Sequence, residues 1–201
     1  MSTTIPSSPV PMFPLPGFFL YPAQMLPLHI FEPRYRQMID ESLDGHGRII
    51  IGTALSGGET PPVLAVAGLG EIIRHEKLPD GRYHVWLLGL TRVRIEEAPS
   101  DRLYRMARCS VFDEIEASPG KARALKTMLS LATRSRIKKQ LTIPPLVSTS
   151  VLTDLLMQTV QAPIREIEAI FAEPSIVERA RMALAAHRRY PPTQVAENSA
   201  E

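Results

Sequence analysis

The sequence predicts an α+β fold with a β-rich N-terminal part and a helical C-terminal part. Over residues 11–116, apolar side chains alternate with polar ones or form short β-branched runs, as strands do. Over residues 117–190, apolar positions recur at spacings of three and four, as in helices. One helical segment interrupts the first part. We therefore expect a β-rich subdomain at 11–116, a helical subdomain at 117–190, and flexible tails at 1–10 and 191–201.

Composition is that of a folded protein without a strong charge bias. An apolar fraction of 44% in 201 residues supplies a core. The 23 basic and 21 acidic side chains nearly cancel, which argues against a dedicated polyanion binder. The single cysteine, Cys109, excludes an intramolecular disulfide and fits a reducing compartment; we expect it to pack as a small hydrophobe. Closely spaced prolines interrupt the apolar N-terminal run, so we expect no signal peptide, no membrane span and a cytoplasmic location.

Two proline-containing extended segments, 11–16 and 26–31, open the β-rich part. Proline has no amide N–H, so these segments suit sheet edges or bulges. Pro33 suits the first position of a helix that Gly45 closes. The helix has its apolar positions on one face: Tyr35, Met38, Ile39 and Leu43.

The remaining β-rich sequence predicts a small barrel or a strongly coiled sheet of five or six strands. Arg48 to Leu55 contains three consecutive isoleucines and predicts a strand, followed by a Gly/Pro-rich loop. Val63 to Glu97 predicts a β-meander, with Pro79-Asp80-Gly81 as a turn. Tyr83 to Leu88 is apolar on both faces, which favours a central strand. Tyr104 to Phe112 completes the series.

Four helices are predicted in the C-terminal part. Ser118 and Pro119 form an N-cap and first-turn pair for a helix that runs towards Lys139. Its stripe comprises Ala122, Leu125, Met128, Leu129 and Ala132. We expect a second helix at about 150–159, and Pro163 and Pro174 to open the third and fourth.

Motifs for catalysis, metals and cofactors are absent or incomplete. No P-loop occurs, and the glycine pair Gly68 and Gly70 lacks the third glycine of a dinucleotide site, which favours a turn or bulge. Ser56 is one residue from a nucleophile elbow but lacks a following helix, so a loop is favoured and a hydrolase is a third, weaker hypothesis. No two histidines have metal-ligand spacing. We expect no catalytic residue, no metal and no cofactor.

The strongest local bias is basic, over residues 119–139. The segment has no acidic residue, and its cations are candidates for contact with RNA, DNA or an acidic partner. The cations are Lys121, Arg123, Lys126, Arg134, Arg136, Lys138 and Lys139. The segment lacks aromatic side chains for base stacking, and a solvated face explains it more simply. RNA binding is therefore the alternative function and not the favoured one.

Several motifs occur in a fixed order along the chain: Phe13-Pro14-Leu15-Pro16-Gly17, Tyr21-Pro22, the stretch Leu26 to Arg36 that contains FEPRYR, the stretch Gly68 to Arg94, and Ile143-Pro144-Pro145. Together they resemble the N-terminal domain of the ATP-dependent Lon proteases, and most closely its free-standing bacterial members. The resemblance covers about residues 11–188. It implies a six-stranded pseudo-barrel related to PUA folds, followed by a helical bundle, without the ATPase and peptidase parts of Lon.

The resemblance also implies a non-enzymatic module that binds protein. Expected partners are unfolded or partly folded clients, together with a protease or chaperone; a membrane is not expected, and an oligomer is compatible with the family role. Our hypothesis for the binding surface is the loop with Phe18, Phe19 and Tyr21, because aromatic anchors dominate many interfaces. The alternative is that Phe19 and Tyr21 fill the barrel.

Overall fold

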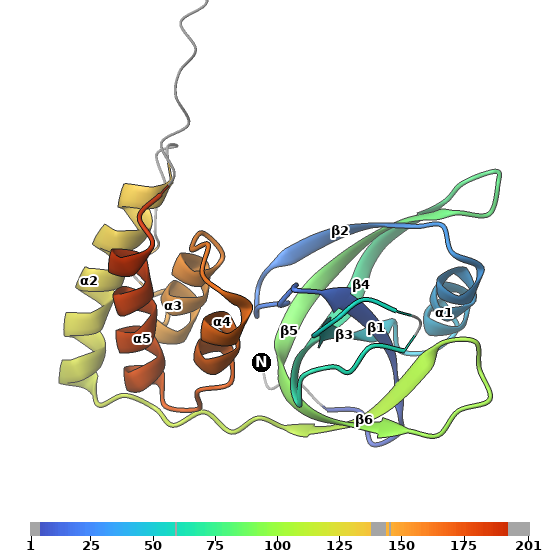
Figure 1. The fold of residues 1–201 in the computed structure, drawn as a ribbon, viewed down its shortest axis with the longest axis horizontal. Coiled ribbons are helices and arrows are strands. Elements are labelled where there is room, and N and C mark those ends of the chain that lie inside the picture. Colours follow the sequence, from blue (N-terminus) through green and yellow to red (C-terminus); the bar gives the residue numbers. More distant parts are fainter. Residues whose placement is uncertain (1–4, 59, 138–143, 145, 193–201) are drawn as a thin grey trace, which may run out of the picture. The chain divides into compact units, whose positions relative to one another are not determined.

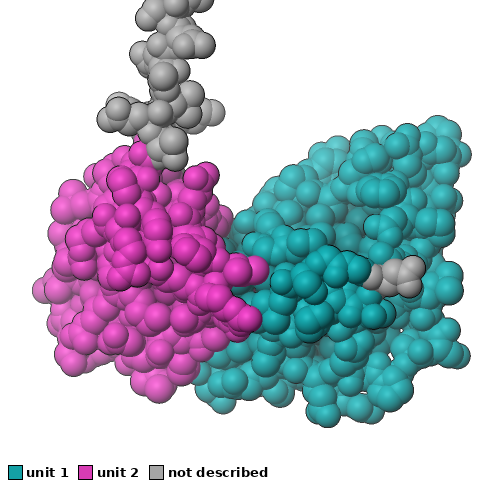
Figure 2. Space-filling model, in the orientation of Figure 1, with its two compact units in different colours: residues 1–113 teal, residues 114–201 magenta. Residues whose placement is uncertain are grey.

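The computed structural model describes four stretches of the chain: residues 5–58, 60–137, 144 and 146–192. The tails expected at 1–10 and 191–201 lie in part outside them. Two compact units are present, unit 1 (1–113) and unit 2 (114–201), coloured separately in Figure 2. Unit 1 holds a sheet and one helix, and unit 2 is helical, so the α+β prediction is confirmed. None of the helices in these stretches has the length and apolar character needed to cross a bilayer.

Six strands form the mixed sheet of unit 1 (Figure 1). They are β1 (Val10–Pro16), β2 (Met25–Ile30), β3 (Arg48–Ala54), β4 (Val66–Lys77), β5 (Tyr83–Ala98) and β6 (Arg105–Val111). The strand order is β2-β5-β4-β3-β1-β6, and β6 also pairs with β5. That pairing closes five strands into a ring, with β2 attached beside the first half of β5. The predicted pseudo-barrel is thus confirmed.

Prolines in β1 and β2 lie where the strand has one hydrogen-bonded neighbour. β1 pairs with β6 over Val10–Met12 and with β3 over Met12–Pro16, so Met12 alone is matched on both sides. A single neighbour therefore remains for the three prolines of the strand: Pro11, Pro14 and Pro16. Pro27 lies on β2, whose sheet partner is β5. The edge prediction holds locally for β1, although the strand lies inside the sheet order.

β3 is buried on both faces because it separates two hydrophobic clusters. Ile49 and Ile51 join a cluster that contains Met38 of helix α1 (Pro33–Leu43). Ile50 points the opposite way and joins a cluster with Leu69. Successive side chains of a strand alternate in direction, so a run of isoleucines serves both clusters.

Hydrogen bonds fasten the polar side of α1 to the strands. Asp40 accepts a hydrogen bond of 2.8 Å from the Lys77 Nζ and another from the Tyr83 hydroxyl. Glu41 accepts a hydrogen bond of 2.8 Å from the Tyr104 hydroxyl. Burial raises the pKa of Asp40, but the hydrogen bonds from Lys77 and Tyr83 outweigh it and hold that pKa below its ordinary value. The pKa of Glu41 also lies below its ordinary value, chiefly because Glu41 accepts the hydrogen bond from Tyr104.

The chain between β1 and β2 crosses the sheet at very close range. A Cβ at Gly68 would overlap the carbonyl oxygen of Leu20, and one at Gly89 would overlap that of Tyr21. Glycine is therefore required at both positions. The pairing register of β4 shifts next to Gly70, so the glycine pair of β4 belongs to a bulge and a close backbone approach.

The described residues of unit 2 form four helices (Figure 1). They are α2 (Pro119–Arg136), α3 (Thr149–Met157), α4 (Ile164–Phe171) and α5 (Ile176–Arg189). The Ser148 hydroxyl caps α3 by accepting a hydrogen bond of 3.1 Å from the Val151 N–H. Ser175 caps α5 in the same way at 3.3 Å from Glu178, so this helix begins two residues later than the predicted start at Pro174.

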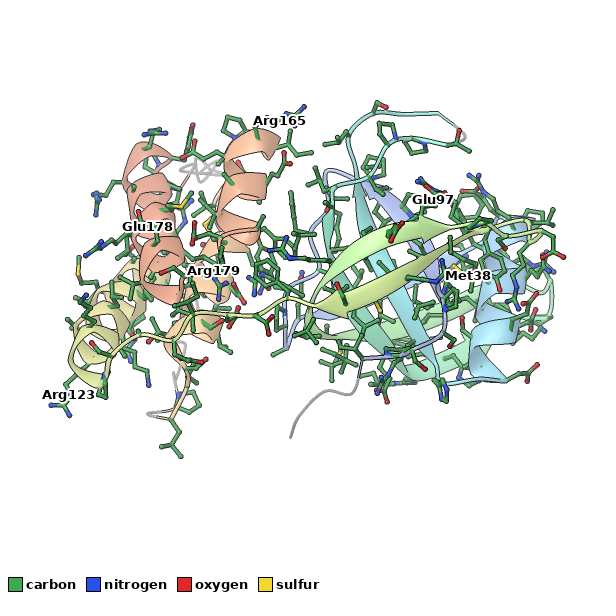
Figure 3. The ribbon with its side chains drawn as sticks, turned by 90° about the horizontal axis from the view of Figure 1, so that it is seen from below. Met38, Glu97, Arg123, Arg165, Glu178 and Arg179 are labelled. Atoms are coloured by element: carbon green, nitrogen blue, oxygen red, sulfur yellow. The ribbon has the colours of Figure 1, made fainter. Side chains whose placement is uncertain are left out.

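A buried arginine holds the bundle together. Arg179 is fully buried, and its guanidinium lies 2.5 Å from a carboxylate oxygen of Glu114. It also donates to the Ser150 hydroxyl at 2.7 Å and to the Glu173 carbonyl at 2.9 Å. Figure 3 shows Arg179 between the helices. One side chain thus joins the start of the unit, α3, the turn before α5, and α5 itself.

Candidate functional site

The loop with Phe18, Phe19 and Tyr21, which was predicted to be a binding surface, is mostly buried. Phe19 and Tyr21 are each 5% exposed. The centre of the Tyr21 ring lies 5.8 Å from the guanidinium carbon of Arg92, which is also buried. Phe18 is half-buried against the cluster beneath α1. The expectation that Phe19 and Tyr21 are available to a partner is corrected, because both side chains are buried; Leu20 between them joins the cluster beneath α1.

The basic residues of α2 differ in what they do. Arg136 donates to the carbonyls of Thr159, at 2.9 Å, and Tyr190, at 2.8 Å. The prediction that Arg136 contacts an anion is corrected, because its guanidinium donates hydrogen bonds to carbonyls at the C-terminal ends of α3 and α5. Lys126 is half-buried, whereas three cations are exposed: Lys121, Arg123 and Arg134. Lys138 and Lys139 lie outside the described residues.

The motif residues of unit 1 line a concave pocket of about 370 Å³, here called the motif pocket. Its walls come from β1, from β2 and the start of α1, and from the loop between β3 and β4. The lining residues include Phe13, Pro14, Leu15, Pro16, Leu28, His29, Phe31, Glu32, Arg34, Tyr35, Ser56, Gly57 and Pro61. Most of these are apolar, and the prolines present no amide N–H.

Charges at the motif pocket are neutralised locally. Arg34 and Glu32 form an ion pair with an N–O distance of 2.8 Å. The Arg34 guanidinium also lies 4.6 Å from the centre of the Tyr35 ring. That ring packs on Phe13 with 4.3 Å between ring centres, and burial raises the pKa of the Tyr35 phenol. The pocket therefore has a neutral aromatic wall at physiological pH.

An exposed aromatic ring stands at the rim of the motif pocket. Phe31 is 60% exposed, and its ring centre lies 6.1 Å from that of His29. Ser56 is also at the pocket, but β3 is followed there by a loop and not by a helix, so the nucleophile-elbow geometry is absent. Exposed apolar surface beside a concave site is typical of a binding surface.

The outward face of β2 and β5 adds further apolar and aromatic side chains. Pro27 lies directly opposite Trp86, and the Arg74 guanidinium lies 4.6 Å from the Trp86 ring centre. Met25 is 56% exposed at one end of this face. Ile73 is 48% exposed beside it, at a register irregularity of β4. This surface lies on the sheet side opposite the cluster beneath α1.

The sequence did not predict Phe31 as a site residue, although Phe31 belongs to the FEPRYR motif. The available signal was its place: Phe31 follows the alternating strand β2 and precedes Pro33, which starts α1. A residue between a strand and a helix belongs to neither periodic pattern, so the pattern does not assign its side chain to a buried face. No local sequence signal marked Ile73, because its exposure arises at a register irregularity in the pairing of β4 with β5.

Comparison with known proteins places this fold in a family. Residues 9–186 match the model of the "ATP-dependent protease La (LON) substrate-binding domain". Among solved structures, the N-terminal domain of the Mycobacterium avium complex Lon protease has a TM-score of 0.67 at 14% identity, covering 90% of this chain and 98% of that one. A Lon N-terminal domain protein from Xanthomonas campestris has a TM-score of 0.66 at 18% identity, covering 89% and 98%. These structures show the same fold.

Curated relatives are Lon proteases. The Cytophaga hutchinsonii protein is 23% identical over 86% of this chain and 23% of its own length. The Brevibacillus choshinensis protein is 24% identical over 87% of this chain and 24% of its own length. The chain thus spans about a quarter of these relatives. On the match over residues 9–186 and the shared fold, the chain belongs to the Lon substrate-binding domain family.

Proposed function

We propose that unit 1 binds short apolar segments of other polypeptides at the motif pocket, with Phe31 as an exposed aromatic contact. The observation that carries this proposal is the coincidence of two features: the motif residues of a substrate-binding family line one apolar pocket, and its rim has a 60% exposed phenylalanine. The clients are unfolded or partly folded proteins, since folded proteins bury the side chains that would enter the pocket.

Proline walls favour recognition by apolar contact and shape. Pro14, Pro16 and Pro61 cannot donate backbone hydrogen bonds, and the Glu32–Arg34 pair is already satisfied. Burying one leucine or phenylalanine contributes about 1.5–3 kcal/mol, so a single anchor binds weakly. Several apolar segments on one client give several ways to occupy the pocket, which favours an unfolded chain over an isolated peptide in proportion to their number.

This role is one of binding without catalysis. Among the described residues, no group of three His, Cys, Asp or Glu is placed to hold a metal. Any processing of a bound client would then fall to a separate protease or chaperone activity. The salt dependence of client binding separates this role from RNA binding, which weakens steeply as salt rises.

A pair of matched variants tests the proposal. Phe31→Ser should weaken binding of a fluorescently labelled, carboxymethylated unfolded protein about tenfold, as followed by anisotropy, since it removes an exposed apolar contact. Leu103→Ser is the control, because Leu103 is 69% exposed in unit 1 and does not line the motif pocket. Equal binding by the two variants would contradict the proposal.

A second variant fills the pocket. A side chain at Gly57 would meet no atom within 4 Å of its Cβ, so Gly57→Phe should fold normally and compete with a client for the pocket. Weaker capture by Gly57→Phe with an unchanged circular dichroism spectrum supports the proposal, whereas unchanged capture counts against the pocket.

A further inference from the structure

Helix α2 has a second apolar stripe besides the one that packs into the bundle. Leu125 and Leu129 are buried. The other stripe, here called the α2 stripe, consists of Ala124, Met128 and Leu131, at spacings of four and three. These residues share one face of the helix, turned about 120° from the buried pair. Met128 is 49% exposed and Leu131 is 64% exposed.

Cations that pair with no carboxylate among the described residues flank the α2 stripe. Arg123 and Arg134 are eleven residues apart and lie on the same flank, and Lys121 lies on the other flank. All three are exposed, and no carboxylate among the described residues forms an ion pair with them. Figure 3 shows Arg123 pointing away from the bundle. The helix itself contains no acidic residue.

We propose that the α2 stripe and its flanking cations dock an amphipathic acidic helix of a partner protein. Apolar side chains of that helix would cover Met128 and Leu131, and its carboxylates would pair with Arg123 and Arg134. Charge complementarity carries this choice, because α2 offers cations with no carboxylate of its own to neutralise them. The distance from Arg123 to Arg134 along the helix is about 16 Å, which three helical turns of a partner span.

Other occupants fit less well. A second copy of the α2 surface would bring cations against cations with no carboxylate between them. Nucleic acid would gain nothing from Met128 and Leu131, and α2 has no aromatic side chain for base stacking. An anionic bilayer would receive a stripe of only three side chains from a helix whose other face is held in the bundle. The site lies in unit 2, so it does not depend on the motif pocket of unit 1.

A charge-swap titration of the full chain tests the proposal. The probe is a labelled helical peptide of four turns with leucine along one face and glutamate along one edge; its counterpart has lysine in place of glutamate. The glutamate peptide should bind the unaltered chain at least tenfold more tightly than the lysine peptide. The double variant Met128→Ser/Leu131→Ser should weaken binding about tenfold. Arg123→Glu/Arg134→Glu should reverse the preference between the peptides.

Leu103→Ser is the control, because Leu103 is 69% exposed in unit 1 and belongs to neither the motif pocket nor the α2 stripe, so peptide binding should be unchanged. Phe31→Ser keeps the two proposals apart: it weakens any binding of the leucine face at the motif pocket, and the binding that remains should still prefer the glutamate peptide. All substituted side chains are largely exposed, so folding is retained, and circular dichroism checks it. Equal binding of the two peptides, or binding insensitive to Met128 and Leu131, would overturn the proposal. So would self-association, phosphatidylserine vesicles or a single-stranded RNA engaging Met128 and Leu131 in place of the glutamate peptide.

Discussion

Unit 1 and unit 2 place their charged side chains differently. At the motif pocket of unit 1, Arg34 is paired with Glu32 on the surface, and the exposed feature beside them is the apolar ring of Phe31. In unit 2 the cation Arg179 is buried and paired with Glu114, while Arg123 is exposed and pairs with no carboxylate among the described residues. At the motif pocket the surface charges are already paired, so recognition there rests on apolar contact. On α2 the exposed cations are not paired, so that surface favours an acidic partner.

Breaking the buried ion pair of unit 2 should have the largest effect on stability. Glu114→Ala removes the carboxylate that contacts the fully buried Arg179 guanidinium, which costs about 3–5 kcal/mol in the free energy of unfolding. The matched control is Glu178→Ala, whose pair with Arg181 is exposed on both sides, so its cost is under about 1 kcal/mol. Urea unfolding followed by circular dichroism at 222 nm measures both. Similar losses for the two variants would show that burial does not set the strength of the pair.

Unit 1 should instead be most sensitive where two backbone segments approach closely. Gly68→Ala and Gly89→Ala force a Cβ against the carbonyls of Leu20 and Tyr21, at a cost of about 1–3 kcal/mol. Trp86 is the single tryptophan and lies in unit 1, so its fluorescence reports this unfolding. Gly57→Ala, also in unit 1, meets no neighbouring atom and should cause no loss. Wild-type stability of both barrel variants would mean that the segment can move away from the sheet.

Acid should loosen the attachment of α1 by a smaller amount. The folded-state pKa values of Asp40 and Glu41 lie below their ordinary values, so their contribution is complete above the unfolded pKa and disappears as pH falls through the folded values. The loss should begin near pH 4 and continue below it. Asp40→Asn/Glu41→Gln should flatten this part of the profile of unfolding free energy against pH. An unchanged slope in the double variant would assign acid sensitivity to other carboxyls.

Local sequence signals predicted most elements of both units. The isoleucine run of β3 and the Pro79–Gly81 turn are found as expected, with Gly81 at a φ of 81°. The helix that follows Pro33 was also expected, and it ends at Leu43, two residues before the glycine named as its end. These features depend on residues close together in the chain, which is why sequence alone identified them.

Features set by distant residues were missed or misassigned. Aromatic character marked Phe19 and Tyr21 as contact residues, but both are buried in a segment whose backbone approaches Gly68 and Gly89, far along the chain. Arg179 gave no signal of burial, because a charged residue within a helix is ordinarily exposed until its partner is known. Phe31, the exposed aromatic residue of the candidate site, belongs to the FEPRYR motif. It lies outside the periodic pattern of any strand or helix, so that pattern did not predict its exposure.

Site-specific photocrosslinking tests the binding surface of unit 1 most directly. Benzoylphenylalanine would be placed at position 31, and in a control at position 103, and each chain irradiated with the carboxymethylated unfolded client. We predict crosslinks from position 31 to apolar segments of the client and few from position 103, although both sites are exposed. Retained client binding with no excess of crosslinks at position 31 over position 103 would contradict the account.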